Sequence, residues 1–392
     1  MNILISGAGI AGITAAIYLQ DGNHEITVID RVPIKEHRGY GISLKGFGIE
    51  IFKELGLVGQ LLDNEIFIDY YSTYDASGNL IRRFSKSLID ELTGGAIPIS
   101  RAHLHRALFE KLSPSVKMRY GLNIISLNSH DNGVFVNFNN GTSDQFDLLI
   151  VAEGIRSSTR RQIWGEMGEV HFDLMYAAGV ININHGFPRG EAKTYKGVGC
   201  NISFFPVTPY QIAVQASFRE SASCRDFSEN VFRQLFVDFT KEVTKLTNQI
   251  DEKRNMYFDK VGMIKLDKLY KSRVVLLGDA AYCPSFLSGM GASLSLLGAK
   301  NLAYQINNSG SNLKDALNNY DEMIRPLAVH FQKNAIANMK REIPPTARSE
   351  RITKFIMKYI PMPVIKRAVR KQLLTEQDLV NKMLTSTIKK QD

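Results

Sequence analysis

The chain has 392 residues, of which 44% are apolar and 22% charged, a balance typical of a folded globular protein rather than a disordered or fibrous one. Its formal net charge is +9, but residues 340–392 hold 13 Lys and Arg against 5 Asp and Glu, and the preceding residues hold 35 against 34. The basic character therefore belongs to the C-terminal end, where no nucleic-acid recognition module is found, and no nucleic-acid partner is expected.

Cysteine usage and apolar runs indicate the setting of the protein. Cys200, Cys224 and Cys283 have neither CxxC nor metal-ligand spacing, so we expect no disulfide framework and no metal site. The first apolar run lacks a basic start and leads directly into a glycine loop, which indicates a buried strand and not a signal peptide. No run reaches the ~18 apolar residues that a membrane-spanning helix needs. We expect a cytoplasmic, monomeric enzyme.

Residues 2–30 have the pattern of a strand, a helix of small residues and a second strand. The first turn carries Gly7, Gly9 and Gly12 as G-x-G-x-x-G, which permits a tight turn, close approach of a pyrophosphate and close helix packing. Asp30 ends the second strand, where a carboxylate can accept hydrogen bonds from the hydroxyls of an adenine ribose. This predicts a dinucleotide site that also includes the residues between the glycines, Ala8, Ile10 and Ala11.

Two later apolar strands are expected to join the same domain. Residues 146–154 and 272–281 each end at a glycine and an acid, so the cofactor domain is predicted to be discontinuous. After the second strand, Asp279 can accept hydrogen bonds from ribityl hydroxyls. Gly289 and Gly291 would let backbone N–H groups at a helix start approach a flavin and stabilise its negative charge on reduction. A nicotinamide dehydrogenase does not need this second polar terminus, so the pattern favours FAD.

The chain between and after these motifs has a different pattern. Alternating runs over residues 172–220 predict an antiparallel sheet packed on one side. The predicted fold is α/β, with a Rossmann-like FAD-binding domain at 1–170 and 270–341. An inserted antiparallel β-sheet substrate domain is predicted at 171–269, and C-terminal amphipathic helices at 342–392. Phe204, Phe205, Pro284 and Met290 are candidate residues of the substrate pocket.

The basic C-terminal tail, residues 342–392, is predicted to form two amphipathic helices. The second covers residues 364–384 and follows a break at Pro361 and Pro363. The first helix has its apolar residues on one stripe, which consists of Ile352, Phe355, Ile356, Tyr359 and Ile360. Two interpretations remain open: the tail packs across both domains and closes the substrate site, or it makes a weak peripheral contact with an anionic membrane.

The three elements GAGIAG with Asp30, LLIVAEGIRSSTR and VVLLGDAAYCPSFLSGMGASL resemble those of the group A flavoprotein monooxygenases of the para-hydroxybenzoate hydroxylase type. The resemblance covers residues 1–341. It implies bound FAD, transient NADPH, molecular oxygen and attack of a C4a-hydroperoxyflavin on an aromatic or polyketide small molecule. It also implies cofactor contacts by Arg31, Arg38, Arg101, Asp279, Pro284 and Ala292. The third motif and the added C-terminal helices are most similar to the tetracycline-inactivating branch.

Several positions depart from the family pattern. Glu153 replaces the Asp of the middle motif, Met290 and Ser293 replace the Gln and Asn of the third motif, and Ser43 replaces an acid. The longer carboxylate of Glu153 would alter nicotinamide docking. No second G-x-G-x-x-G is present, so a separate nicotinamide domain is not expected. Two alternative functions stay open: a flavin-dependent reductase of a prenyl or quinone-like substrate, and a non-catalytic FAD-binding protein. The chemistry requires no protein nucleophile, so no catalytic side chain is named.

Overall fold

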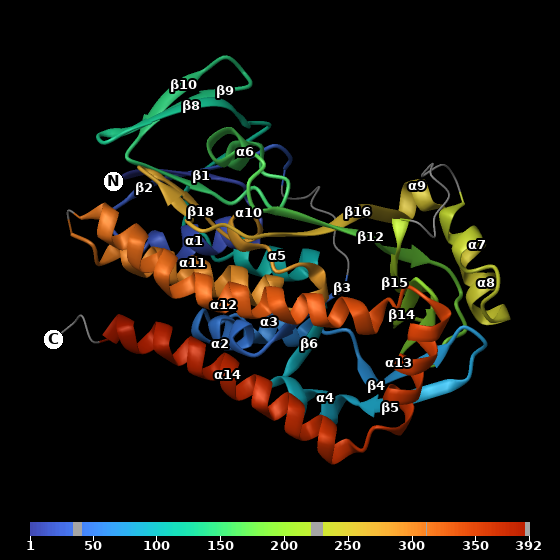
Figure 1. Cartoon of the computed structure of the whole chain (residues 1–392). Helices are drawn as coiled ribbons and strands as arrows, with labels where there is room; N and C mark the ends of the chain where they lie inside the picture. Colours follow the sequence, from blue (N-terminus) through green and yellow to red (C-terminus); the bar gives the residue numbers. More distant parts are fainter. Residues whose placement is uncertain (34–40, 221–229, 311, 389–392) are drawn as a thin grey trace.

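The computed structural model describes residues 1–33, 41–220, 230–310 and 312–388, in which two large sheets lie side by side and long helices run beneath them (Figure 1). The fold is α/β, as the sequence predicted, and of its two large sheets one is mostly parallel and the other mostly antiparallel. Within the described residues no helix is both long and apolar enough to cross a membrane.

The first sheet has six strands in the order β17-β18-β11-β1-β2-β7, and all neighbours are parallel except β17 and β18. The strands are β1 (Asn2–Ser6), β2 (Glu25–Asp30), β7 (Lys117–Tyr120), β11 (Leu148–Val151), β17 (Tyr270–Lys271) and β18 (Val274–Leu276). Strands from the start, the middle and the last third of the chain are thus neighbours. One sheet therefore joins segments that are far apart in the sequence.

Both faces of the parallel sheet are covered, because each of its central strands is apolar on both sides. One face packs against α1 (Ile10–Leu19), α11 (Gly291–Asn307) and α12 (Leu313–Glu342). The other face packs against a three-stranded sheet of β8 (Ile124–His130), β9 (Gly133–Phe138) and β10 (Ser143–Phe146). Short elements on this domain are α2 (Phe47–Glu54), α3 (Val58–Asp63), α5 (Arg101–Phe109), α6 (Ser158–Trp164) and α10 (Asp279–Tyr282).

The second sheet has seven strands in the order β16-β12-β15-β14-β13-β4-β5 and is antiparallel except between β13 and β4. Its strands are β4 (Ile68–Asp75), β5 (Leu80–Ser85), β12 (Glu169–Asn182), β13 (Gly190–Gly197), β14 (Cys200–Thr208), β15 (Gln211–Phe218) and β16 (Met256–Ile264). The sheet is therefore wider than the interval 171–269, because β4 and β5 extend it from the N-terminal third. A two-stranded ladder of β3 (Gly41–Lys45) and β6 (Ala96–Ser100) connects the two regions.

Alternation gives the second sheet one apolar face and an opposite face that is mostly polar on β14 and β15 and apolar on β12, at Leu174, Tyr176 and Ala178. The apolar side chains of β14 and β15, among them Phe204 and Val214, form a core with α7 (Val231–Leu235) and α8 (Lys241–Thr247). The short helix α9 (Glu252–Asn255) precedes β16 and has no buried residues. Hydroxyl and amide side chains of β14 and β15, such as Ser203 and Gln215, lie on the opposite face. These polar side chains lie opposite the C-terminal end of α12.

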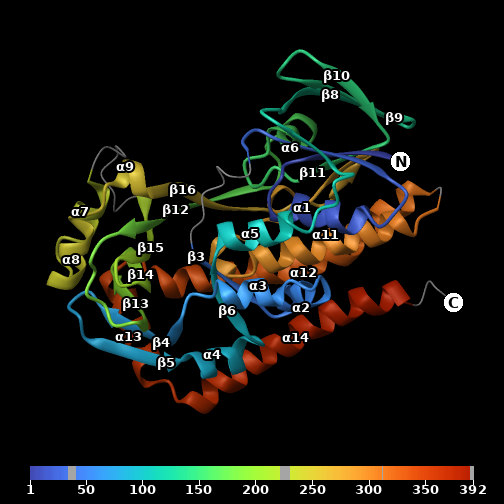
Figure 2. The ribbon, with the colours of Figure 1, turned by 180° about the vertical axis from the view of Figure 1, so that it is seen from behind.

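The tail forms α13 (Ala347–Tyr359) and α14 (Met362–Ile388), which pack across α12, β5 and α4 (Lys86–Thr93), as both views show (Figures 1 and 2). Ile360 is extended between the two helices, since the residue before a proline avoids helical geometry. The Arg82 guanidinium donates to the carbonyls of Lys358 and Ile360 at 3.0 and 2.9 Å. These contacts fix the orientation of the tail on the second sheet.

Candidate functional site

The glycine loop between β1 and α1 has the three geometries that a dinucleotide requires. Gly7 has φ +108°, and a Cβ there would lie 2.4 Å from the carbonyl oxygen of Ala152. A Cβ on Gly12 would lie 1.9 Å from the carbonyl oxygen of Gly7, so only glycine permits this packing. A Cβ on Gly9 would meet nothing within 4 Å, because Gly9 borders an open cavity. The loop is therefore tightly packed against the protein at Gly7 and Gly12 and open to the cavity at Gly9.

The cavity beside this loop has a volume of about 500 Å³. It is lined by residues from β1, β2, α5 and the segment after β11, including Gly7, Gly9, Asp30, Arg31, Arg101 and Glu153. The Asp30 carboxylate accepts hydrogen bonds from the backbone N–H of Ala8 at 2.8 Å and of Val32 at 3.0 Å. The predicted ribose acid is thus held at the cavity wall, together with two of the three predicted arginines. Arg38 lies outside the described residues.

Helix α5 supports the loop from the other side. Ser100 caps the helix, since its hydroxyl accepts a hydrogen bond from the N–H of Ala102. One turn after Arg101, the buried His105 imidazole lies 2.6 Å from the carbonyl oxygen of Ala8. His105 therefore positions the glycine loop. The family resemblance implied a cofactor contact for Arg101, but nothing in the sequence indicated that His105 would reach the loop.

The third motif meets the first one directly. Ile10 and Ala11 begin α1, and a Cβ on Gly278 would lie 2.7 Å from the Cβ of Ala11, so α1 packs against the turn after β18. Asp279 follows this turn and is half-buried. Burial raises the pKa of Asp279, and the charge of nearby Arg101 opposes that rise. Two motifs that are separated by more than half of the chain therefore form one polar edge of the parallel sheet.

The loop after Asp279 carries strained backbone. Pro284 is buried, Ser285 has φ +69°, and Gly289 has φ +65°. The Ser285 hydroxyl is buried and has no hydrogen-bond partner among the residues that the structure describes. Non-glycine residues in the left-handed region concentrate at ligand-binding loops. Gly291 and Ala292 begin α11, and a Cβ on Gly291 would lie 3.9 Å from a carboxylate oxygen of Asp279.

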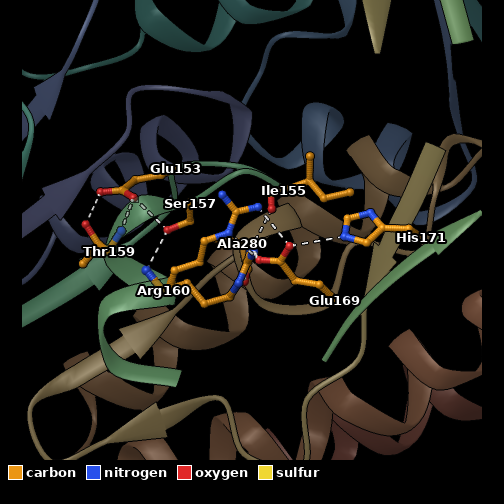
Figure 3. Close-up of polar contacts among 9 residues, drawn as sticks. Glu153, Ile155, Ser157, Thr159, Arg160, Glu169, His171 and Ala280 are labelled. Atoms are coloured by element: carbon orange, nitrogen blue, oxygen red, sulfur yellow. Dashed lines mark hydrogen bonds and ion pairs between the residues drawn. The ribbon is translucent and has the colours of Figure 1, made fainter. Parts of the chain in front are cut away.

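Glu153, which replaces the Asp of the middle motif, is held by four donors, of which Figure 3 shows those of Ser157 and Thr159. One carboxylate oxygen accepts from the hydroxyls of Ser6 and Thr159, each at 2.6 Å. The other accepts from the Ser157 hydroxyl at 2.7 Å and the Thr159 N–H at 3.1 Å. The carboxylate therefore joins the end of β1 to the start of α6. The extra methylene is used for this bridge, while the side chain still lines the cavity.

Arg160 is a structural residue that the sequence reading missed. Its fully buried guanidinium donates to the carbonyls of Ile155 at 2.9 Å and Ala280 at 3.3 Å and pairs with Glu169 (Figure 3). Hydrogen bonds from Arg161 and the pair with Arg160 lower the pKa of Glu169 to about 2. Arg160 thus fixes the middle motif against the third one. Only its place in the IRSSTR segment could have drawn attention to it.

A second cavity of about 320 Å³ lies between the polar face of the seven-stranded sheet and the Phe286–Ser288 turn. The sheet contributes the side chains Tyr176, Thr194, Asn201, Ser203, Gln215 and Ser217. Gly289, Lys45 and Arg341 line the other walls. Lys45 and Gly289 are close, since a Cβ added to Gly289 would lie 3.2 Å from the Lys45 ammonium. Burial lowers the pKa of Lys45, and the charge of Glu376 on α14 opposes that change.

The four candidate pocket residues do not line this cavity. Phe204 is fully buried on the opposite face of the sheet, with its ring 5.4 Å from that of Phe187. Phe205 packs beside Ile66 and Ile68, and Pro284 is buried within its loop. Met290 is half-buried against the main core. The aromatic wall of the cavity consists instead of Tyr176 and Phe286, whose ring centroids are 4.4 Å apart.

The other departures from the family pattern also have structural roles. The Ser293 hydroxyl donates to the carbonyl of Lys45 at 2.9 Å and accepts from its N–H at 3.4 Å. It thereby ties α11 to the end of β3. A Cβ on Gly48 would lie 2.5 Å from the same hydroxyl, so the start of α2 packs closely here. Ser43 pairs in register with Pro98 in the β3–β6 ladder.

These residues fit FAD. The open cradle at Gly9 suits a pyrophosphate, the Asp30 carboxylate suits a ribose, and the half-buried Asp279 beside the α11 start suits a ribityl chain and a flavin ring. Arg101, whose charge acts on Asp279, lines the first cavity, and Gly289, ten residues after Asp279, lines the second.

Comparison with known proteins agrees with this geometry. Residues 1–335 match the family described as FAD binding domain. An FAD-dependent monooxygenase of Sarocladium schorii is 26% identical over 85% of this chain and 86% of its own length. The crystal structure of tetracycline destructase Tet(55) is 25% identical with a TM-score of 0.76, covering 91% of this chain and 95% of that one. Klebsiella pneumoniae HpxO in complex with FAD and uric acid is 21% identical, with a TM-score of 0.79 and coverage of 95% and 97%.

Proposed function

The chain belongs to the FAD binding domain family and is a flavin-dependent monooxygenase, and from this premise we propose that it adds one oxygen atom to a small aromatic or polyketide molecule, with NAD(P)H as the electron donor. The observation that carries the proposal is the packing of Ala11 against Gly278. This contact brings the glycine loop and Asp279 to one edge of the sheet, and the chain after Asp279 lines the second cavity at residues 286–289.

The chain's own residues would hold the cofactor along this edge. The N–H groups of the glycine loop and the positive end of α1 would bind the pyrophosphate, and Asp30 would accept from the ribose hydroxyls. Asp279 would accept from the ribityl hydroxyls. The start of α11, at Gly291, has no side-chain cap among the described residues, so its first N–H groups would stabilise negative charge on the ring. When bound, FAD supplies the redox chemistry, taking electrons from the nicotinamide and activating oxygen.

The second cavity suits a small, flat, polar substrate. Its volume lies within the usual range for ligand pockets, and six of its side chains on the sheet can hydrogen-bond to a ligand. Ser217 is only 5% exposed and lines the cavity, so its hydroxyl is placed to bind a substrate there. Tetracyclines and hydroxylated aromatic or heteroaromatic rings are the candidates. A prenyl chain would place hydrocarbon against this polar wall without offering it any hydrogen-bonding group, which disfavours a prenyl substrate for the reductase alternative.

The test is product analysis with the FAD-loaded protein, NADPH and oxygen. Tetracyclines, phenols, quinone precursors and purines are supplied in turn, and oxygen uptake is measured together with product mass. We expect one compound to stimulate oxygen uptake and to gain one oxygen atom. A product that gains two hydrogens without oxygen would instead establish the reductase.

A pair of variants links activity to the second cavity. Ser203→Leu fills the cavity and is expected to lower oxygenated product at least about tenfold while bound flavin is retained. Ser126→Leu places the same side chain on an exposed position of β8 and serves as the control. Equal turnover by both variants would show that the substrate binds elsewhere.

A further inference from the structure

Helix α13 presents its apolar stripe to solvent. Ile352, Phe355, Ile356 and Tyr359 are 52%, 65%, 51% and 60% exposed. The side that faces the protein is instead mostly polar and half-buried, and it consists of Ser349, Glu350, Thr353, Lys354, Met357 and Ile360. This is the reverse of the usual arrangement, in which an amphipathic helix buries its apolar stripe in the protein core.

Specific contacts hold the helix in this orientation. Thr346 and Ser349 form a capping box at its start. Lys354 pairs with Asp75 of β4, and the Lys196 ammonium lies 3.8 Å from the sulfur of Met357. At its end, Arg82 donates to two carbonyls of the last turn and the linker. Rotating the stripe inward would break the contacts of Lys354 with Asp75 and of Met357 with Lys196, so the exposed apolar face is a built feature of the fold.

The charges around the outer stripe have one sign. Residues 351–375 contain seven Lys and Arg and no Asp or Glu. Arg348, Arg351 and Lys358 are exposed on α13 and form no ion pair with any residue that the structure describes. Val364 and Leu374 extend the exposed apolar surface onto α14, where Arg367, Arg370 and Lys371 are also exposed.

We propose that the outer stripe of α13, defined as Ile352, Phe355, Ile356 and Tyr359, inserts into the surface of a membrane that contains anionic lipids. An apolar stripe flanked by basic residues is the pattern of helices that lie in the lipid headgroup region, because apolar insertion and attraction to anionic lipid act together. A second copy of the chain fits this surface poorly, since pairing two stripes would bring Arg348, Arg351 and Lys358 of both copies together.

The membrane contact would lie beside the second cavity. Lys196 connects the two features, because its ammonium is 2.5 Å from a carboxylate oxygen of Glu342, which lines that cavity, and also contacts Met357. Docking through α13 would therefore bring the cavity close to the lipid surface. Membrane binding does not depend on the identity of the substrate and can be tested without turnover.

The test is sedimentation of the FAD-loaded protein with vesicles of phosphatidylcholine alone and of an equal mixture of phosphatidylcholine and phosphatidylglycerol. We expect binding to the mixed vesicles only, and release by high salt. The double variant Phe355→Ser/Tyr359→Ser should bind at least about tenfold more weakly, because affinity scales with the inserted apolar area. The control, Phe135→Ser/Tyr210→Ser, removes two exposed aromatic side chains from other surfaces and should bind as the parent does.

Several results would overturn the proposal. Equal binding to both kinds of vesicle would show that anionic lipid is not required, and no binding to either kind would show that the stripe does not bind a membrane. A concentration-dependent dimer that is lost in the Phe355→Ser/Tyr359→Ser variant, seen by sedimentation velocity, would assign the stripe to self-association. Unchanged flavin content in both double variants verifies that the fold is intact.

Discussion

Replacing Gly9 by alanine separates cofactor binding from folding. Gly9 has φ −76° and ψ −173°, which alanine adopts freely, and its new methyl group would meet no protein atom within 4 Å. Alanine is less favourable than glycine at a helix N-cap by several tenths of a kcal/mol, and its lower unfolded-state entropy offsets this by about 0.4–1 kcal/mol. The melting temperature of the apo-protein should therefore change by no more than about 2 °C.

FAD affinity should respond differently to the same substitution. If the pyrophosphate passes over Gly9, the methyl group occupies its path, and an overpacked contact of this kind costs about 1–3 kcal/mol. That cost corresponds to a roughly 5- to 150-fold higher Kd. The assay is titration of apo-protein with FAD, followed by quenching of flavin fluorescence, beside thermal unfolding without FAD.

Gly12→Ala is the matched control, because its Cβ would lie 1.9 Å from the Gly7 carbonyl oxygen and must disturb the fold itself. We expect it to lower the free energy of unfolding of the apo-protein by at least about 1–3 kcal/mol. Unchanged FAD affinity in Gly9→Ala would refute the reasoning, since the loop would then not approach the cofactor.

Three further changes test the scaffold and the second cavity. Glu169→Gln should lower the free energy of unfolding at pH 7 by about 3–5 kcal/mol, because it leaves the buried Arg160 charge unpaired. The pKa of Glu169 is lowered to about 2 from 4.5, so the stabilisation by its carboxylate is present above pH 4.5 and is lost as the pH falls toward 2. A plot of unfolding free energy against pH should therefore be flatter below pH 4.5 in the variant than in the parent. Ser217→Ala should raise KM about fivefold, the effect of one lost hydrogen bond, while flavin content stays constant; an unchanged KM would exclude contact with the substrate. Arg82→Ala should loosen the tail, which limited proteolysis would report as faster cleavage after residue 346; equal cleavage rates would mean that its two hydrogen bonds to the tail contribute little.

The cofactor side of the molecule could be predicted because its motifs impose demands on the backbone. Any chain with this site must meet three local requirements: a positive φ at the position of Gly7, close helix packing at that of Gly12, and an acid at a strand end. The meeting of Ala11 with Gly278 follows from placing two such motifs on one parallel sheet.

The substrate side was harder to predict because it depends on register and on distant partners. In β14, a shift of one residue decides whether Phe204 or Ser203 faces the cavity, and the sequence does not contain that register. The pairing of β4 with β13 is parallel and joins segments more than a hundred residues apart, so no local pattern announces it. The stripe on α13 was visible in the sequence, but not that it would face solvent.

The strand order of the parallel sheet has a consequence for biosynthesis. Strand β11 pairs with β1 on one side and with β18 on the other, and β18 ends at Leu276. When a ribosome has translated only the first two thirds of the message, β1, β2 and β11 have been made but β18 has not, so the edge of β11 that pairs with β18 is still unpaired. Such an edge invites pairing with another nascent chain, and its native partner arrives slowly because the contact is long-range. Protection by a chaperone, or rapid completion of translation, would be of most value during that interval.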